Sequence, residues 1–254
     1  MEDAARGEGQ VIALPTIWRV PDDLWALVRP VLAACDPPKR PGRQRIDPRA
    51  ALDAIIFRLR SGCQWNRLPR EFPDDSSVHR TFQRWVRAGV LARIWAVLVG
   101  QCAERGGVQW AWQAADAALG KARSGGDHVG RNPTDRGEAG VKRSVLAEAA
   151  GGPLSAVVAA ANVHDTKLLA ATLGAVIVPR PAPTSETPQH LCSAGVRRYP
   201  ARRWVVERTL GWLSKCRALL VRYDKKAGNF LGLIQLACAL LWYRRLQRLG
   251  GDSR

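Results

Sequence analysis

The stretch Val-Lys-Arg-Ser-Val-Leu-Ala-Glu-Ala-Ala-Gly-Gly-Pro-Leu-Ser-Ala-Val-Val-Ala-Ala-Ala (residues 141–161) holds two short apolar runs, 141–149 and 154–161, on either side of a Gly-Gly-Pro turn. Short apolar or alternating runs that are bounded by Gly and Pro are typical of β-strands. A third run of this kind, residues 108–119, comes before them. Together the three runs predict a β-sheet that is entered by an antiparallel meander.

Helical patterns lie on both sides of this predicted sheet. On the N-terminal side, apolar periodicity and helix-start residues, among them Asp47 and Asp74, predict helices over 24–32, 48–60, 75–87 and 90–102. On the C-terminal side, the same signals predict helices over 165–173, 201–220 and 230–246, with a short strand at 176–178. Gly106-Gly107 marks a domain boundary. The chain is therefore predicted to have a disordered tail (1–14), an all-α module (15–104) and an α/β domain (108–248).

The composition points to a polyanionic partner. The formal net charge is +17, the isoelectric point is near 10.7, and most of the cations are arginines. The guanidinium group of arginine binds two phosphate oxygens at once and stacks on bases, so nucleic acid is favoured over an acidic membrane as the partner. A biased genomic base composition would also enrich Arg. The six cysteines have no paired spacing, the start is not a secretory signal, and the apolar run 231–242 is too short to cross a bilayer. These features predict a reduced, cytoplasmic protein with no membrane partner.

The helix predicted over 75–87 resembles the recognition helix of a helix-turn-helix unit. Arg80, Arg84 and Arg87 recur on one face of it, where they could contact phosphates or guanine edges in a major groove. The alternative is an ordinary amphipathic surface helix. Since the whole chain is strongly basic, we treat the three arginines as candidate DNA contacts.

Two acidic residues lie in distinct motifs among basic neighbours. Asp116 is expected at the end of an apolar strand, from which a carboxylate projects into a cleft, although an Asp at a strand end is often only a cap. Glu207 lies on a predicted helix beside Arg203 and Arg208, where an ion pair on a solvated face is the alternative. A third acid is harder to find, because only Glu186 lies between Asp165 and Glu207.

Four blocks of the sequence resemble bacterial insertion-sequence transposases of the DDE type, in the group called insertion sequence family five. The blocks are Ser-Gly-Cys-Gln-Trp-Asn-Arg-Leu-Pro (61–69), Asn-Pro-Thr-Asp-Arg-Gly (132–137), Ala-Asn-Val-His-Asp (161–165) and Arg-Trp-Val-Val-Glu-Arg-Thr (203–209), in the family's order. The resemblance implies a ribonuclease-H-like catalytic domain in which Asp, Asp and Glu hold two Mg²⁺ ions. By position, Asp116 matches the first catalytic acid and Glu207 the last, and both would be metal ligands.

The second acid of the family is missing from its expected place. It should lie in a block close to His-Leu-Cys-Xaa-Asp-Xaa-Gly-Tyr-Asp, whereas this chain has His-Leu-Cys-Ser-Ala-Gly-Val at 190–196. The family also places a longer segment between this block and the last acid. An internal deletion near 192–198 that removed the second Asp is therefore expected. Glu186 in a Pro-rich loop and Asp165 as a helix cap are poor substitutes, and a two-metal site with two acids lacks ligands.

The resulting prediction is a transposase that binds the ends of its element but is catalytically impaired. The expected partners are the terminal inverted repeats and target DNA, with a homo-oligomer on DNA left open, and Lys121, Arg203 and Arg208 would neutralise phosphate charge. One alternative is a non-catalytic DNA-binding protein that represses or inhibits the full-length enzyme. Another is a decayed gene product that folds poorly.

Overall fold

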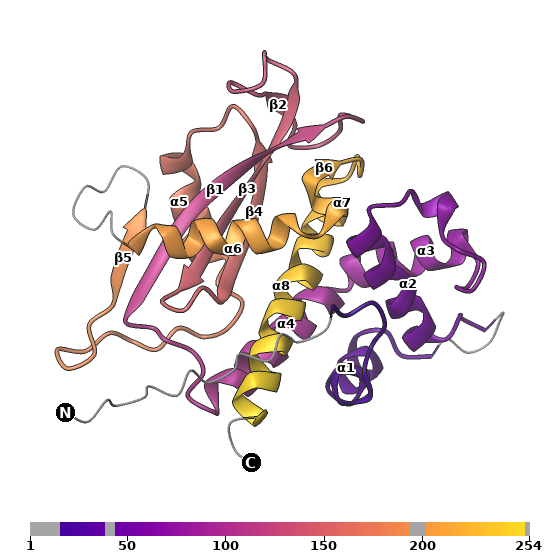
Figure 1. The fold of residues 1–254 in the computed structure, drawn as a ribbon, viewed down its shortest axis with the longest axis horizontal. Helices are drawn as coiled ribbons and strands as arrows, with labels where there is room; N and C mark the ends of the chain where they lie inside the picture. The colour runs from indigo at the N-terminus through magenta and orange to yellow at the C-terminus, as the bar shows by residue number, and fades with distance from the viewer. Residues whose placement is uncertain (1–15, 39–43, 194–201, 252–254) are drawn as a thin grey trace, which may run out of the picture.

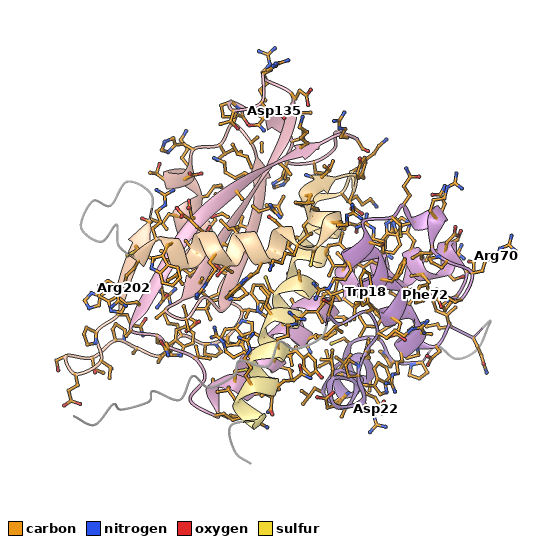
Figure 2. The ribbon with its side chains drawn as sticks, in the orientation of Figure 1. Trp18, Asp22, Arg70, Phe72, Asp135 and Arg202 are labelled. Carbon is orange, nitrogen blue, oxygen red and sulfur yellow. The ribbon has the colours of Figure 1, made fainter. Side chains whose placement is uncertain are left out.

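The computed structural model describes residues 16–38, 44–193 and 202–251, and its N-terminal part is helical (Figure 1). All four helices predicted there are confirmed: α1 (Asp22–Cys35), α2 (Pro48–Ser61), α3 (Asp75–Arg87) and α4 (Val90–Ala103), with a short 3₁₀ turn, η1 (Trp65–Arg67). Aromatic side chains hold the outer surface of this part together. Phe57 lies 5.8 Å from Trp18 and 5.1 Å from Phe72 between ring centroids (Figure 2).

The helix-start residues act as the sequence predicts. The Asp47 side chain accepts a hydrogen bond from Ala50 N at 2.8 Å, and the Asp74 side chain accepts one from Ser77 N at 2.9 Å. Each bond satisfies one of the amide groups that a helix N-terminus leaves without a partner. Gly62 ends α2 in the left-handed conformation, which glycine adopts without steric cost.

Asp36, just after α1, ties that helix to α3. It accepts hydrogen bonds from Arg84 Nε at 2.9 and 3.0 Å and from Trp85 Nε1 at 2.8 Å, and it pairs with Arg45. Burial raises the pKa of this carboxyl, but the hydrogen bonds from Arg84 and Trp85 and the charges of Arg84 and Arg45 outweigh it and hold the pKa below its ordinary 3.8. The charged form of Asp36 therefore stabilises the fold.

Replacing Asp36 by Asn should lower the free energy of unfolding at pH 7 by about 1–3 kcal/mol, because charged hydrogen bonds are lost at a mostly buried group. A lowered pKa gives stability that is present above pH 3.8 and lost as the pH falls through the folded-state value. Urea titrations from pH 7 to pH 2 should thus show the two proteins converging in acid. Asp22→Asn, at an exposed ion pair, is the control. An equal loss at pH 7 and pH 2 would contradict this account.

The α/β part is built on a mixed sheet whose first three long strands form the predicted meander. These are β1 (Trp112–Ala122), β3 (Ala139–Glu148) and β4 (Pro153–Ala160), each antiparallel to its neighbour. Two shorter strands, β5 (His190–Ser193) and β6 (Val221–Arg222), pair parallel to β1, and β2 (Gly130–Arg131) pairs with β3. The strand order along the sheet is therefore β4-β3-β1-β5, with β1 in the interior.

Helices α5 (Asp165–Gly174) and α6 (Trp204–Ser214) cover opposite faces of this sheet. Successive side chains of a strand point to opposite faces. In β3, Ser144 Oγ lies 2.7 Å from Thr172 Oγ1 of α5, while Arg143 Nη2 donates to Ser214 Oγ of α6 at 3.4 Å. Figure 1 shows α6 crossing the strands on the near face. The first residues of α6 consequently lie over β1.

The long helix α8 (Ala227–Gly251) lies beside α4 and joins the helical part to the sheet (Figure 1). Trp95 Nε1 of α4 and Trp242 Nε1 of α8 both donate to Pro153 O at the β3–β4 turn, at 3.2 and 2.6 Å. A single cluster of buried apolar side chains runs through both parts of the chain. The division near Gly106 remains a prediction about domains, and the two parts share one core.

Three local predictions were wrong. Residues 176–178 form no strand, because Ile177 donates one bond to Leu154 O and Pro179 follows with no amide hydrogen to extend the pairing. The helix predicted over 201–220 breaks into α6 and α7 (Arg217–Leu220), since Cys216 takes an extended conformation between them. Asp116 lies within β1 rather than at its end.

The link between α2 and α3 is longer than the turn of a compact helix-turn-helix unit. Residues 62–74 and the η1 turn separate the two helices, whereas a helix-turn-helix unit joins its helices by a turn of about 3–4 residues. No single described helix is long and apolar enough to cross a membrane; α3 and α4, which are bent by 65° at their junction, reach that length and composition only when taken together. The predicted tail (1–14) and most of the predicted deletion site lie outside the described residues.

Candidate active site

The two candidate catalytic acids meet at one arginine. Arg203, just before α6, contacts Asp116 of β1 through Nη2 at 3.1 and 3.3 Å and through Nε at 3.2 Å. The same Nε lies 3.4 Å from Glu207 Oε1, one helical turn later. The fold thus brings Asp116 and Glu207 together, and the charge between them is that of a guanidinium group.

The two acids differ in their surroundings. The Asp116 side chain is only 7% exposed and also accepts a hydrogen bond from Ala117 N at 2.9 Å, whereas the Glu207 side chain is 56% exposed. Glu207 lies in the first turn of α6, where the helix dipole favours a negative charge. Val205 and Val206 fix that turn to the core, so Glu207 has a rigid backbone and a side chain open to solvent.

Asp165 lies near β1 on the α5 face of the sheet, whereas the Asp116 side chain contacts Arg203 on the α6 face. Together with Asp116, Ser144 and Ser193, it lines a small hollow of about 20 Å³ between the sheet and α5. It is held there by Lys142, whose Nζ donates to Asp165 Oδ1 at 2.7 Å and to Val163 O at 2.6 Å. Asp165 is the first residue of α5, and its charge is neutralised by a mostly buried lysine. The hollow has room for about one water molecule.

The residues present do not fit a two-metal centre. Within residues 16–38, 44–193 and 202–251, no group of three or more His, Cys, Asp or Glu side chains could hold a metal ion. Asp116 and Glu207 both form ion pairs with Arg203, and Asp165 forms one with Lys142. Each of the three acids is therefore paired with a cation of the chain itself. Glu186 is exposed in the loop before β5. Two clustered divalent cations require several converging carboxylates, and this set falls short.

The end of β5 lies beside Asp116. The pairing of β5 with β1 places Ser193 opposite Ala115, the residue before Asp116. Ser193 is the last described residue of this strand, and Ala194 follows it in the sequence. The strand order and this register therefore bring the His-Leu-Cys block to the candidate site, where the block departs from the Asp-containing pattern.

The predicted phosphate-binding residues of the α/β part are already engaged within the chain. The ammonium group of Lys121 pairs with Asp135 at 3.0 Å and Glu138 at 3.2 Å, and the hydrogen bonds and charges of these two acids raise its pKa. Figure 2 shows Asp135 at the outer tip of the sheet, remote from Arg202 near the start of α6. Lys121 is consequently fixed to the tip.

Arg208 lies between two tryptophan rings. Its guanidinium carbon is 4.6 Å from the centroid of Trp204 and 4.8 Å from that of Trp212, and its Nη2 donates to Ala150 O at 3.1 Å. Cation–π contacts of this kind are worth about 0.5–2 kcal/mol. Arg208 therefore anchors α6 to the β3–β4 turn.

The three arginines of α3 differ in what they contact. Arg80 and Arg87 are exposed, and among the described residues Arg80 donates one side-chain bond, to Ser77 Oγ at 3.2 Å. Arg84 is half-buried in the Asp36 ion pair. The exposed members of the predicted set are thus Arg80 and Arg87.

Sequence reasoning missed the link from Arg203 to Asp116. The spacing of Arg203 and Glu207 signals their own pair, one helical turn apart, but Arg203 and Asp116 are 87 residues apart in the chain. It also missed Glu148, which is fully buried at the β3–β4 turn and pairs with Arg245 at 2.7 Å. Both contacts depend on the tertiary fold, and no local pattern indicates them.

Two family models match separate parts of the chain. A model described as "Putative transposase of IS4/5 family" matches residues 20–95, and a model described as "Transposase DDE domain" matches residues 187–242. The second range includes Glu207, whereas Asp116 lies outside both. A DDE transposase domain implies a ribonuclease-H-like fold and a divalent metal cation, typically Mg²⁺, and the mixed α/β architecture agrees with that fold.

Several curated proteins are similar in sequence. The chain is 32% identical over 118 residues to the "Insertion element IS402 uncharacterized 16.2 kDa protein" of Burkholderia cepacia, which covers 45% of this chain and 80% of that protein. It is 28% identical over 155 residues to the "Putative transposase for insertion sequence element IS402" of the same organism, covering 50% of this chain and 74% of that protein. No solved structure matches the chain.

Proposed function

This chain belongs to the DDE transposases of insertion sequences, and on that premise we propose that it binds the ends of its mobile element but is impaired in DNA cleavage and strand transfer. The observation that carries the proposal is the guanidinium of Arg203 between Asp116 and Glu207. An intact member of the family would need a third acid and divalent cations at this place. In this chain Asp116 and Glu207 are instead both paired with Arg203.

The missing acid supports impairment as well. The register of β5 on β1 leads the His-Leu-Cys block to Asp116, and the next residue in the sequence is Ala194, where the family pattern has Asp. Asp165 is paired with Lys142, so it is a poor replacement for the missing second acid. We infer that an internal deletion near 192–198 removed the second acid of the site.

DNA binding is the activity that we expect this chain to retain. The chain carries a net charge of +17, and Arg80 and Arg87 are exposed on one side of α3, where they would contact DNA phosphates or base edges. The partners would be the terminal inverted repeats of the element and target DNA, in the cytoplasm. α3 would then act as the recognition helix, although its link to α2 is longer than in compact helix-turn-helix units.

Changing Arg80 and Arg87 to Gln should weaken binding to a duplex that carries the element's terminal repeat. Each lost phosphate contact lowers the log–log salt slope by about 0.9, so the double variant should lose up to about 1.8. If the side chains contact bases, the preference for the terminal repeat over unrelated DNA should fall too. Fluorescence anisotropy from 50 to 200 mM salt measures both. The control is Arg29→Gln with Arg93→Gln, at exposed helix positions. Equal salt slopes for the two double variants would show that α3 does not contact the DNA.

A non-catalytic role as a repressor or inhibitor of the full-length enzyme is the second candidate. The ion pairs of Arg203 with Asp116 and Glu207 favour it, because they leave neither acid free for a metal ion. Restoring an Asp-containing segment between Cys192 and Arg198 separates the two. Cleavage regained by the repaired chain would identify an impaired transposase whose remaining site is sound. DNA binding without any cleavage after repair would identify a DNA-binding protein that has left catalysis altogether.

A further inference from the structure

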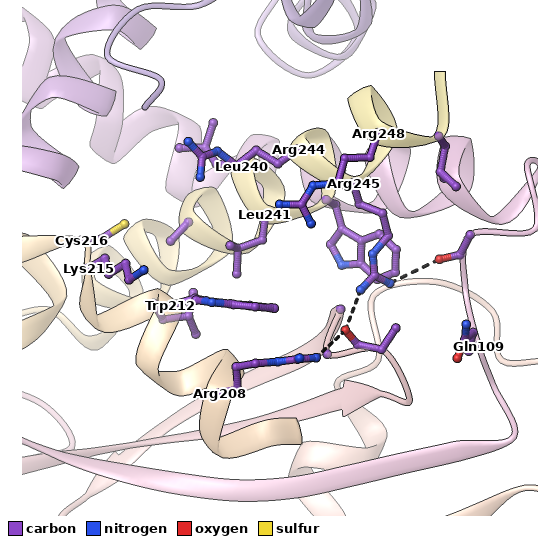
Figure 3. Close-up of a pocket in the computed structure, with 18 of the residues that line it drawn as sticks. Gln109, Arg208, Trp212, Lys215, Cys216, Leu240, Leu241, Arg244, Arg245 and Arg248 are labelled. Atoms are coloured by element: carbon purple, nitrogen blue, oxygen red, sulfur yellow. Dashed lines mark hydrogen bonds between the residues drawn. The ribbon is translucent and has the colours of Figure 1, made fainter. Parts of the chain in front are cut away.

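A hollow of about 670 Å³ lies between α6 and α8 and is lined by cations (Figure 3). Its walls come from the end of α2, the residues after α4, the β3–β4 turn, α6 and α8. None of the residues that line it is Asp or Glu. We name it the arginine groove after its six cationic side chains: Arg60, Arg208, Lys215, Arg244, Arg245 and Arg248.

Internal pairing accounts for only part of this charge. Arg245 pairs with buried Glu148 at 2.7 Å, and Arg208 is held by two tryptophan rings and Ala150 O. Within the described part of the chain, Arg60, Lys215 and Arg248 form no ion pair with a carboxylate. Lys215 and Arg248 are exposed at the mouth of the groove.

The arginines of the groove repel one another. Burial lowers the pKa of Arg244, and the positive charges of Arg60 and Arg248 lower it further. The Nε atom of Arg60 is buried without an acceptor, which costs stability. A cluster of this kind does not serve the fold, because it adds repulsion and an unsatisfied donor. A bound anion would offset the repulsion.

The size and layout of the groove favour a chain of phosphates over a single anion. Its cations come from α2, α6, the residue that follows α6, and α8, and the volume is in the range of pockets for ligands much larger than one phosphate. The half-buried ring of Trp212 forms one wall, which offers a surface for stacking (Figure 3). Arg208 follows Glu207 directly on α6, but the two side chains project about 100° apart around the helix, and neither Glu207 nor Asp116 lines the groove.

We propose that the arginine groove binds the phosphate backbone of a DNA strand. The inference rests on the proposed function, since it takes DNA as the partner, and it assigns a binding surface separate from α3. Contacts to phosphates carry no sequence information, so the groove adds affinity for any DNA, whereas α3 would provide the preference for the element's ends.

The test compares two double variants of the full chain on a duplex that lacks the terminal repeats. The groove variant is Lys215→Gln with Arg248→Gln, and the matched control is Lys167→Gln with Arg93→Gln, at exposed sites outside the groove. Both lose two charges at exposed positions, and thermal melts check that both fold. In anisotropy titrations from 50 to 200 mM salt, the groove variant should lose up to about 1.8 in log–log slope, and the control less than about 0.5.

Equal slopes for the two variants would overturn the groove as a DNA site. A second result would also overturn it: tripolyphosphate binds the wild type but not the groove variant, while both proteins bind DNA with the same affinity. The hollow would then be a site for small polyphosphates. Absence of DNA binding by the wild type would instead overturn the proposed function together with this inference. A selective loss in the groove variant, on terminal-repeat and unrelated duplexes alike, would support it.

Discussion

Replacing Glu148 by Ala should lower the free energy of unfolding by about 3–5 kcal/mol, because it leaves a buried charge without its partner. Glu148 is fully buried, and its Oε1 accepts hydrogen bonds from Arg245 Nη1 at 2.7 Å and Gly152 N at 2.5 Å. Its Oε2 accepts one from Gln109 N at 2.9 Å. The substitution would leave the guanidinium of Arg245 without its counter-charge and two backbone amides, of Gly152 and Gln109, without their acceptor at the β3–β4 turn. Urea denaturation at pH 7 measures the loss.

The control for Glu148 is Glu138→Ala, which removes an exposed partner of Lys121. Exposed ion pairs are worth at most about 1 kcal/mol, so this variant should remain close to the wild type. Glu148→Gln keeps the shape of the side chain, so its free energy of unfolding should lie between those of Glu148→Ala and Glu138→Ala. A Glu148→Ala protein as stable as the Glu138→Ala protein would show that the turn does not depend on the buried pair.

Replacing Arg203 by Gln should turn the acid pair into a cation site. The guanidinium contacts Asp116 and Glu207 within 3.4 Å, and its loss leaves two carboxylates with uncompensated charge. Charges about 4 Å apart near a protein surface interact by about 4 kcal/mol, so we expect Mn²⁺ to bind roughly tenfold tighter than to the wild type or better. Calorimetric titration, with the shift in melting temperature as a second readout, measures the change.

Two further variants make the Arg203 test specific. Arg202→Gln removes the neighbouring cation, whose guanidinium carbon lies 4.2 Å from the ring centroid of Trp112, and it should leave Mn²⁺ affinity unchanged. Arg203→Gln with Asp116→Asn should lose the gain, since one carboxylate is neutral. Unchanged Mn²⁺ binding in Arg203→Gln would mean that the acids do not face a common space.

Local signals in the sequence predicted the framework of this fold. Asp47 and Asp74 were identified as helix starts because a short acidic side chain before a periodic stretch can accept from the first turn, and both do so. The Gly-Gly-Pro turn between two apolar runs predicted the meander of β3 and β4. These features depend on neighbours in sequence, and one chain is enough to recognise them.

The wrong predictions and the missed contacts depend on the tertiary structure. The run at 176–178 has the composition of a strand but finds only one backbone partner, at Leu154. The break at Cys216 separates α6 from α7 within a stretch whose pattern is continuous. The resemblance to the transposases predicts that Arg203 neutralises phosphate charge. Its bonds to Asp116 follow instead from the packing of α6 on β1, which no periodicity of the sequence indicates.

We expect this transposase-family chain to bind DNA and to cut it weakly or not at all, because Arg203 rather than metal ions joins Asp116 and Glu207. The direct measurement is nicking of an end-labelled duplex that carries the element's terminal repeat, with Mg²⁺ or Mn²⁺, at protein concentrations that shift the duplex in a gel. We expect the duplex to be bound and to show little or no cleavage above the protein-free background. Metal-dependent nicking at rates like those of an intact relative, and lost in Asp116→Asn, would contradict this expectation.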